Sequence, residues 1–203
     1  MAAGCTVIGI TGGISTGKST FSKLLQERTG ARLFDADRAA HALVQEDAEV
    51  RALLREQFGP EIFSSTGDLN RGALRAIVFA DPEKKRGVEQ ILHPRIRLQW
   101  STEADHSRQT GALFLADIPL LYETNGANLC DTVVVVACSE SIQQERLLRR
   151  THLAPAEALA MIAAQLPLSQ KISQADHVVW NNGPLGSLAA QVETLAARWT
   201  ATS

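Results

Sequence analysis

The fold is decided by residues 4–20, which read GCTVIGITGGISTGKST. From Gly12 onward the stretch contains G-x-x-x-x-G-K-S, the pattern of a loop that binds phosphate. The apolar run at residues 6–10 predicts a buried strand before the loop, and residues 19–28 predict a helix after it. This context favours a nucleoside triphosphate site over a chance glycine turn.

The loop offers several kinds of phosphate contact. Its glycines let the backbone wrap a phosphate with N–H groups pointing inward, and the helix start adds positive partial charge. Lys18 is placed as a point charge for the β- and γ-phosphates, and Ser19 offers a hydroxyl to Mg²⁺. We expect the nucleotide to be bound by Gly12, Gly13, Ile14, Ser15, Thr16, Gly17, Lys18, Ser19 and Thr20.

Composition excludes several classes of protein. The chain has 203 residues, 45% of them hydrophobic, and a formal net charge of −2, which argues against nucleic acid or anionic membrane as a partner. No apolar run approaches the roughly 18 residues of a membrane span. The first strand begins too early to leave room for a signal peptide. Cys5, Cys130 and Cys138 form no close pair, which indicates reduced thiols in a cytoplasmic protein.

Strand-like segments alternate with helical ones along the chain. Four more follow the first, at residues 31–34, 112–116, 132–137 and 177–180. The run of four valines within 132–137 is typical of a parallel strand buried on both faces. The alternation predicts an α/β protein with a doubly wound parallel sheet of about five strands, and the loop makes it a three-layer fold of the P-loop NTPase type.

Residues 38–109 form a long helical insertion between two strands. The stretch 38–58 has helical spacing, Asn70 is placed as an N-cap, and Asp81-Pro82 predicts another helix start. We expect His93-Pro94 to interrupt the pattern before a further helix. Later helices are expected at about residues 140–150, 155–165 and 185–199.

Aspartates follow two of the predicted strands. In open parallel sheets the ligand crevice lies outside the carboxyl ends of the strands. Asp35 and Asp37 could therefore bind Mg²⁺ or take a proton from an attacking hydroxyl, and Asp117 could support Mg²⁺. The alternatives are a helix N-cap at Asp37 and a loop aspartate before Pro119 at Asp117.

Arginines cluster in the helix expected at residues 140–150. Arg146 and Arg150 are four residues apart and share a face. On a mobile segment they could close over the nucleotide and offset charge on the transferring phosphoryl group. A solvated charged face is the commoner role for such a helix, and Glu140 and Glu145 nearby favour it.

Other chemical motifs are missing. The sequence has no H-E-x-x-H, no histidine pair with metal spacing and no serine-nucleophile elbow. It also lacks N-K-x-D, since residues 181–184 read NNGP, which argues against a guanine-nucleotide switch.

Together the motifs resemble the dephospho-coenzyme A kinase family over nearly the whole chain. The resemblance rests on the order and spacing of residues 11–20, Asp35-Ala36-Asp37 with His41, Leu92-His93-Pro94, residues 118–123, Arg146, Arg150, Gln165, Lys171 and residues 175–183. It implies that ATP gives its γ-phosphoryl group to the ribose 3′-hydroxyl of dephospho-coenzyme A, the last step of coenzyme A biosynthesis. No protein partner is implied.

The resemblance also implies roles for single residues. Asp37 would be the catalytic base, Asp35 would assist Mg²⁺ or position the acceptor, and Arg146 and Arg150 would be cations of a lid. Metal ligands would be Ser19, Asp35 and Asp117. Asn181 and Gly183 would lie near the adenine. The acceptor side would include Asp35, His41, His93, Pro94 and Leu120.

Three parts are implied by the same resemblance. They are a nucleotide core at residues 1–37, 110–138 and 173–203, a helical acceptor domain at 38–109 and a lid at 139–172. The chain departs from many members at Ser15-Thr16, at Gln170 and at Trp180, whose ring could stack on a base or cover the core. The competing hypotheses are a nucleoside or nucleotide kinase of similar core, and a nucleotide-binding switch.

Overall fold

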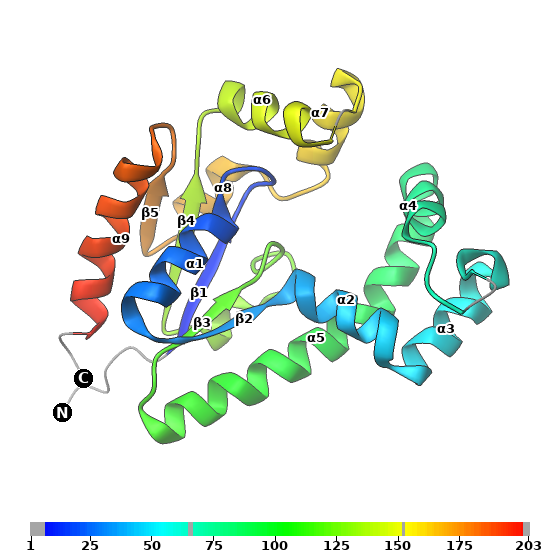
Figure 1. Cartoon of the computed structure of the whole chain (residues 1–203), viewed down its shortest axis with the longest axis horizontal. Coiled ribbons are helices and arrows are strands. Elements are labelled where there is room, and N and C mark those ends of the chain that lie inside the picture. The colour runs from blue at the N-terminus through cyan, green and yellow to red at the C-terminus, as the bar shows by residue number, and fades with distance from the viewer. Residues whose placement is uncertain (1–6, 65–66, 152, 201–203) are drawn as a thin grey trace. The chain divides into compact units, whose positions relative to one another are not determined.

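Parallel strands form a single sheet in the order β2-β3-β1-β4-β5 (Figure 1). The computed structural model describes residues 7–64, 67–151 and 153–200. Residue 6 of the first expected strand, Cys5 and residues 65–66 lie outside them. The strands are β1 (Val7–Gly12), β2 (Arg32–Asp35), β3 (Phe114–Asp117), β4 (Thr132–Ala137) and β5 (His177–Trp180). The prediction of a five-stranded parallel α/β sheet is confirmed.

Helices connect the strands along the chain. They are α1 (Lys18–Thr29), α2 (Ala36–Glu46), α3 (Ala48–Phe58), α4 (Arg71–Ala80), α5 (Pro82–Thr110), α6 (Glu140–Thr151), α7 (Pro155–Ala163), α8 (Leu168–Ser173) and α9 (Leu185–Thr200), with short 3-10 turns η1 (Pro60–Ile62) and η2 (Ala127–Leu129). Helix α8 was not expected from the sequence. None of the helices within the described ranges is long and apolar enough to cross a membrane.

The chain divides into two compact units, residues 1–35 with 101–203, and residues 36–100. We call them the sheet unit and the helical unit. The core of the sheet unit lies between α1, α9 and one face of the sheet, and is formed by Ile8, Ile10, Phe21, Leu25, Ala31, Leu115, Val134, Val136, Val179, Leu188, Val192, Ala196 and Trp199. On the opposite face Gly9 leaves room for Cys130 and Leu121, because a Cβ there would meet Cys130 Sγ at 2.6 Å.

The helical unit has a hydrophobic core of its own. Its members are Leu43, Val44, Val50, Leu54, Phe58, Ile62, Phe63 and Ile91. The expectation of one helical stretch over 38–58 is wrong in one respect, because Asp47 separates α2 from α3. Asp47 Oδ1 accepts hydrogen bonds from the Glu49 and Val50 amides at 2.9 and 3.0 Å, so it caps α3. Asn70 caps α4 as predicted, accepting from Ala73 N at 3.0 Å.

Helix α5 runs through Pro94 without a break, so the expected interruption at His93-Pro94 is wrong. Proline removes one helical hydrogen bond at a cost of about 3 kcal/mol. Ile91 before the proline and Trp100 after it are both buried, and the packing of these two side chains offsets this cost. Arg95 adds a side-chain hydrogen bond to the Ile91 carbonyl at 3.0 Å in the same turn.

Candidate active site

The phosphate loop leads from β1 into α1 as the motif predicts. Gly17 has φ +94° and Ser15 has φ +60°, so both adopt the left-handed conformation that wraps the loop. A Cβ at Gly17 would lie 2.1 Å from Asn181 Nδ2, which excludes any larger residue there. Among the described residues no side chain caps the start of α1 at Lys18, so this helix end can take an anion.

Asn181 supports the loop from the end of β5. Its buried Nδ2 donates a hydrogen bond to the Thr16 carbonyl at 2.9 Å. Thr16 in turn donates from Oγ1 to the Gly13 carbonyl at 2.9 Å. Gly183 is exposed two residues further on. Asn181 thus has a structural contact to the loop that the sequence did not reveal.

Lys18 and Asp117 form an ion pair at the carboxyl edge of the sheet. Asp117 is 2% exposed, and this burial raises the pKa of its carboxyl, while Lys18 and a hydrogen bond from Ser22 act in the opposite direction. The structure thus brings together the two charges that the sequence placed on this edge. A phosphate entering the loop would compete with Asp117 for the Lys18 ammonium.

The predicted Mg²⁺ ligands have suitable chemistry. Asp35 is paired with Asp117 in the register of β2 and β3, and its negative charge contributes to the raised pKa of Asp117. Ser19 is exposed at the start of α1. The part of the chain that the structure describes has no group of three His, Cys, Asp or Glu side chains able to hold a metal. Two carboxylates and a hydroxyl nevertheless fit Mg²⁺, which keeps several waters and binds substrate phosphates.

Asp37, His41, His93 and Pro94 all belong to the helical unit. Asp37 and His41 are exposed on α2. Because α2 begins at Ala36, Asp37 lies within its first turn, and the alternative of an N-cap at Asp37 is wrong. His93 is half-buried on α5, and burial lowers the pKa of its imidazole while Glu89 opposes that shift.

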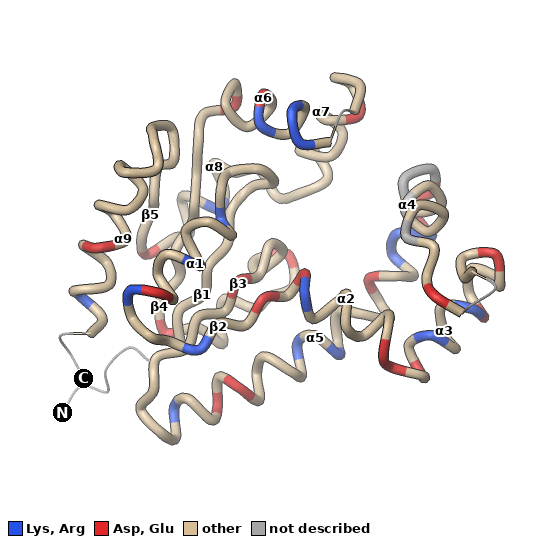
Figure 2. The backbone as a smooth tube through the Cα atoms, in the orientation of Figure 1, with Lys and Arg blue, Asp and Glu red and all other residues tan. Residues whose placement is uncertain are grey.

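The arginines of α6 differ in their surroundings. Arg146 is half-buried and hydrogen-bonds the thiol of buried Cys138, whose pKa is raised by burial and lowered in part by Arg146. Arg149 and Arg150 are exposed in the last turn of α6. Figure 2 shows blue basic segments in this helix after a red acidic one at its start. The helix therefore presents exposed cations next to one anchored arginine.

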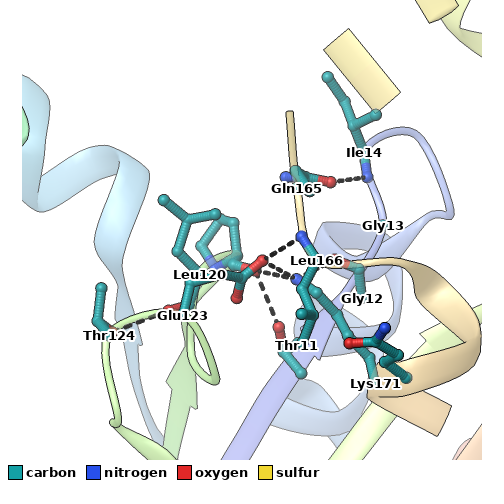
Figure 3. A network of polar contacts seen from close by, with 12 residues as sticks. Thr11, Gly12, Gly13, Ile14, Leu120, Glu123, Thr124, Gln165, Leu166 and Lys171 are labelled. Atoms are coloured by element: carbon teal, nitrogen blue, oxygen red, sulfur yellow. Dashed lines mark hydrogen bonds and ion pairs between the residues drawn. The ribbon is translucent and has the colours of Figure 1, made fainter. Parts of the chain in front are cut away.

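Two further predicted positions lie near the sheet edge. Leu120 is half-buried in the turn after β3, where its carbonyl accepts a hydrogen bond from Thr124 Oγ1 at 2.8 Å (Figure 3). Trp180 is 48% exposed at the end of β5, which argues against a role in covering the core. The Gln191 side chain holds the backbone of Trp180 through both its N–H and its carbonyl.

The family resemblance rests in part on Glu123, Gln165 and Lys171, but it gave these residues no role, and Gln143 was not singled out. The structure places all four in polar contacts beside the phosphate loop (Figure 3 draws three of them). A local signal is lacking because their partners lie up to 159 residues away in the chain. A lysine within a pattern of apolar and polar residues looks like a surface residue until its neighbours are known.

A phosphate loop between the first strand and helix of a parallel sheet, with acidic residues at the same edge, defines the class of P-loop nucleotide-binding proteins. The family model of dephospho-CoA kinase matches residues 6–186. Proteins called dephospho-CoA kinase are 46% identical in Anaeromyxobacter dehalogenans, over 94% of this chain and 90% of theirs, and 38% identical in Bacillus licheniformis, over 96% of both. The chain therefore belongs to the dephospho-CoA kinase family.

Solved structures agree on the fold. The dephospho-CoA kinase of Campylobacter jejuni superimposes with a TM-score of 0.66 at 23% identity, covering 95% of this chain and 96% of that one. Shikimate kinase of Acinetobacter baumannii gives a TM-score of 0.57 at 14% identity, covering 98% and 95%. At these identities the likeness shows a shared kinase-type fold alone.

Proposed function

We propose that this protein transfers the γ-phosphoryl group of ATP to the ribose 3′-hydroxyl of dephospho-coenzyme A, giving coenzyme A and ADP. The match to one family across residues 6–186 is the observation that carries the proposal. The intact phosphate loop, with Lys18 paired to Asp117 at the edge of the sheet, supports it. The reaction would complete coenzyme A biosynthesis.

The sheet unit would bind ATP. The loop from Gly12 to Thr20 would surround the phosphates with backbone donors, and Lys18 would exchange Asp117 for the β- and γ-phosphates. Mg²⁺ would be held by Ser19, Asp35 and Asp117 and would neutralise charge on the phosphate oxygens. Asn181 and Gly183 would border the adenine.

The helical unit would supply acceptor contacts. The attacking 3′-hydroxyl would give its proton to the Asp37 carboxylate while its oxygen bonds to the γ-phosphorus and ADP leaves. His41, His93 and Pro94, with Leu120 and Asp35 from the sheet unit, would contact the acceptor. The exposed position of Asp37 is compatible with this role, because a base must reach the substrate.

Residues 139–172 would form a lid over the nucleotide, with Arg146 and Arg150 as its cations. The core and acceptor domains would be residues 1–37 with 110–138 and 173–203, and residues 38–109. We also propose a cytoplasmic location, which the three cysteines support because they form no close pair in the sequence. No partner other than the substrates is proposed.

A panel of acceptors tests the function. Purified protein is incubated with Mg²⁺ and ATP, and ADP is measured with dephospho-coenzyme A, nucleosides, nucleoside monophosphates or no acceptor. ADP formation should depend on dephospho-coenzyme A and yield coenzyme A. Preference for a nucleoside would favour a nucleoside kinase, and turnover that no acceptor changes would favour a switch protein.

Asp37→Asn tests the proposed base. We expect turnover to fall by about 10²- to 10⁴-fold, because a positioned general base contributes that much, while ATP affinity stays nearly unchanged. Glu46→Gln is the matched control, since Glu46 is also an exposed acid on α2. Equal loss of ATP binding and turnover, accompanied by unfolding, would make Asp37 a structural residue.

A further inference from the structure

Lys171 lies fully buried in α8, at the centre of a polar network (Figure 3). Its Nζ lies 2.9 Å from Glu123 Oε1 and donates to the Pro119 carbonyl at 2.9 Å. The same ammonium reaches the carbonyl of Gly12, the first residue of the phosphate loop, at 3.5 Å. One side chain thus contacts the end of β1 and the turn after β3.

The partners of Lys171 are themselves tied to other segments. Glu123 Oε1 also accepts a hydrogen bond from Leu166 N at 3.0 Å, and the Pro119 carbonyl accepts one from Thr11 Oγ1 at 3.0 Å. The network therefore joins the C-terminal end of β1, the turn after β3 and the residues that precede α8.

Ile14 in the phosphate loop is held on both sides by glutamines. Its N–H donates to Gln165 Oε1 at 2.8 Å, and its carbonyl accepts from Gln143 Nε2 at 2.9 Å. Gln143 belongs to α6 and Gln165 precedes α8. The segment between them is therefore hydrogen-bonded to Ile14 of the loop at its first and at its last residue. This segment contains the arginines of α6.

Stability alone does not explain a buried lysine. Taking an ammonium out of water costs several kcal/mol, and a buried ion pair often does no better than apolar residues of the same size. Burial indeed lowers the pKa of Lys171, with Glu123 opposing and the nearby charge of Lys18 adding to the shift. Its two contacts to backbone carbonyls, those of Gly12 and Pro119, instead fix the direction of these carbonyls beside the loop.

We propose that Lys171, held by Glu123, is a positioning residue that keeps the phosphate loop in its nucleotide-binding conformation and links it to the segment between Gln143 and Gln165. It touches no substrate in this scheme and acts through the Gly12 and Pro119 carbonyls. The proposal rests on the proposed kinase function only in that ATP is the nucleotide. ATP binding without acceptor therefore tests it separately.

The test removes both charges at once. Lys171→Met with Glu123→Gln keeps the side-chain volumes similar and leaves no lone buried charge. Val192→Ala is the control, because Val192 lies in the core between α9 and the sheet and is expected to lower stability without touching the network. ATP dissociation constants are measured by calorimetry at a temperature at which circular dichroism shows every variant folded.

We expect the double variant to bind ATP about tenfold more weakly than the wild type, a change of about 1.4 kcal/mol in binding free energy, because the Gly12 and Pro119 carbonyls lose their charged donor. Val192→Ala should bind ATP as the wild type does. Hydrogen exchange of the amides of residues 12–16 should accelerate in the double variant alone. Wild-type affinity together with wild-type exchange in the double variant would overturn the proposal.

A milder variant decides the matter if the double variant does not fold. Glu123→Gln keeps an acceptor for Leu166 N and retains Lys171, but it weakens the hold on the ammonium. The amide of Ile14 should then exchange several-fold faster than in Val192→Ala. Unchanged exchange at Ile14 would assign the buried pair to stability alone and overturn the positioning role.

Discussion

The carboxylate of Asp117 is almost completely buried at the end of β3. Burial raises the pKa of this carboxyl more than Lys18 lowers it. A carboxyl with a raised pKa holds its proton more tightly in the folded protein than in the unfolded chain. It therefore contributes stability at acid pH that is lost as the pH rises through the folded pKa. The ionised form of Asp117, which pairs with Lys18, is thus not the form that burial favours.

Asp117→Asn should reveal this linkage. The free energy of unfolding is measured by urea titration of both proteins without nucleotide, from about pH 4 to pH 7. Relative to the variant, the wild type should lose stability as the pH rises, because the asparagine cannot titrate. Glu27→Gln is the control variant, because it removes an exposed carboxyl from α1. The opposite slope would mean that Lys18 outweighs burial.

Ser15 is strained in the phosphate loop. Its φ of +60° is costly for a residue with a Cβ, and its buried hydroxyl has no partner among the described atoms. Ser15→Gly should raise the free energy of unfolding by about 1 kcal/mol, because glycine adopts this conformation without strain. Thermal unfolding of the nucleotide-free protein measures the change. A loss of stability would show that the hydroxyl has a favourable contact.

Helix α6 holds the arginines whose role the sequence left open. The guanidinium of Arg146 hydrogen-bonds the Cys138 thiol and is held there, whereas Arg149 is exposed. If α6 acts on charge that develops during transfer, Arg146→Ala should lower kcat by about tenfold or more and leave ATP affinity within about twofold. Steady-state kinetics with calorimetry measure both, and Arg149→Ala is the control. An unchanged kcat would mean that the arginines of α6 only form a solvated charged face.

Elements differed in how far the sequence revealed them. Strand β4 was predicted at its observed bounds because four valines in a row specify a strand buried on both faces. Helix α5 was not, because local sequence records the cost of Pro94 but not the burial of Ile91 and Trp100 that offsets it. Helix α8 has six residues, too few for a periodic pattern to appear.

The candidate site shows the same division between local and distant information. The phosphate loop was found because its chemistry is contiguous from Gly12 to Ser19. Asp117 was found because strand ends converge at one edge of a parallel sheet. The network around Lys171 was not, because its contacts arise only when β1, the turn after β3 and α8 are packed together.

The two units have separate hydrophobic cores. If the helical unit binds the acceptor as proposed, a change in one core should affect acceptor use and nucleotide binding separately. Leu54 lies in the core of the helical unit and Leu25 in that of the sheet unit, and both are fully buried. Either change to alanine should cost about 2–5 kcal/mol through lost burial and a cavity. The loss of stability should be confined to the unit that contains the changed residue, since each unit packs its own apolar side chains.

Leu54→Ala should therefore retain ATP binding while losing transfer to dephospho-coenzyme A, mainly through a higher KM for the acceptor. Leu25→Ala should weaken ATP binding itself. Hydrogen exchange resolved by segment provides the physical check, because protection should fall in residues 36–100 for the first variant and in α1 and the strands for the second. Equal loss of ATP binding in both variants would show that the units unfold together and that residues 36–100 are not a separable acceptor domain.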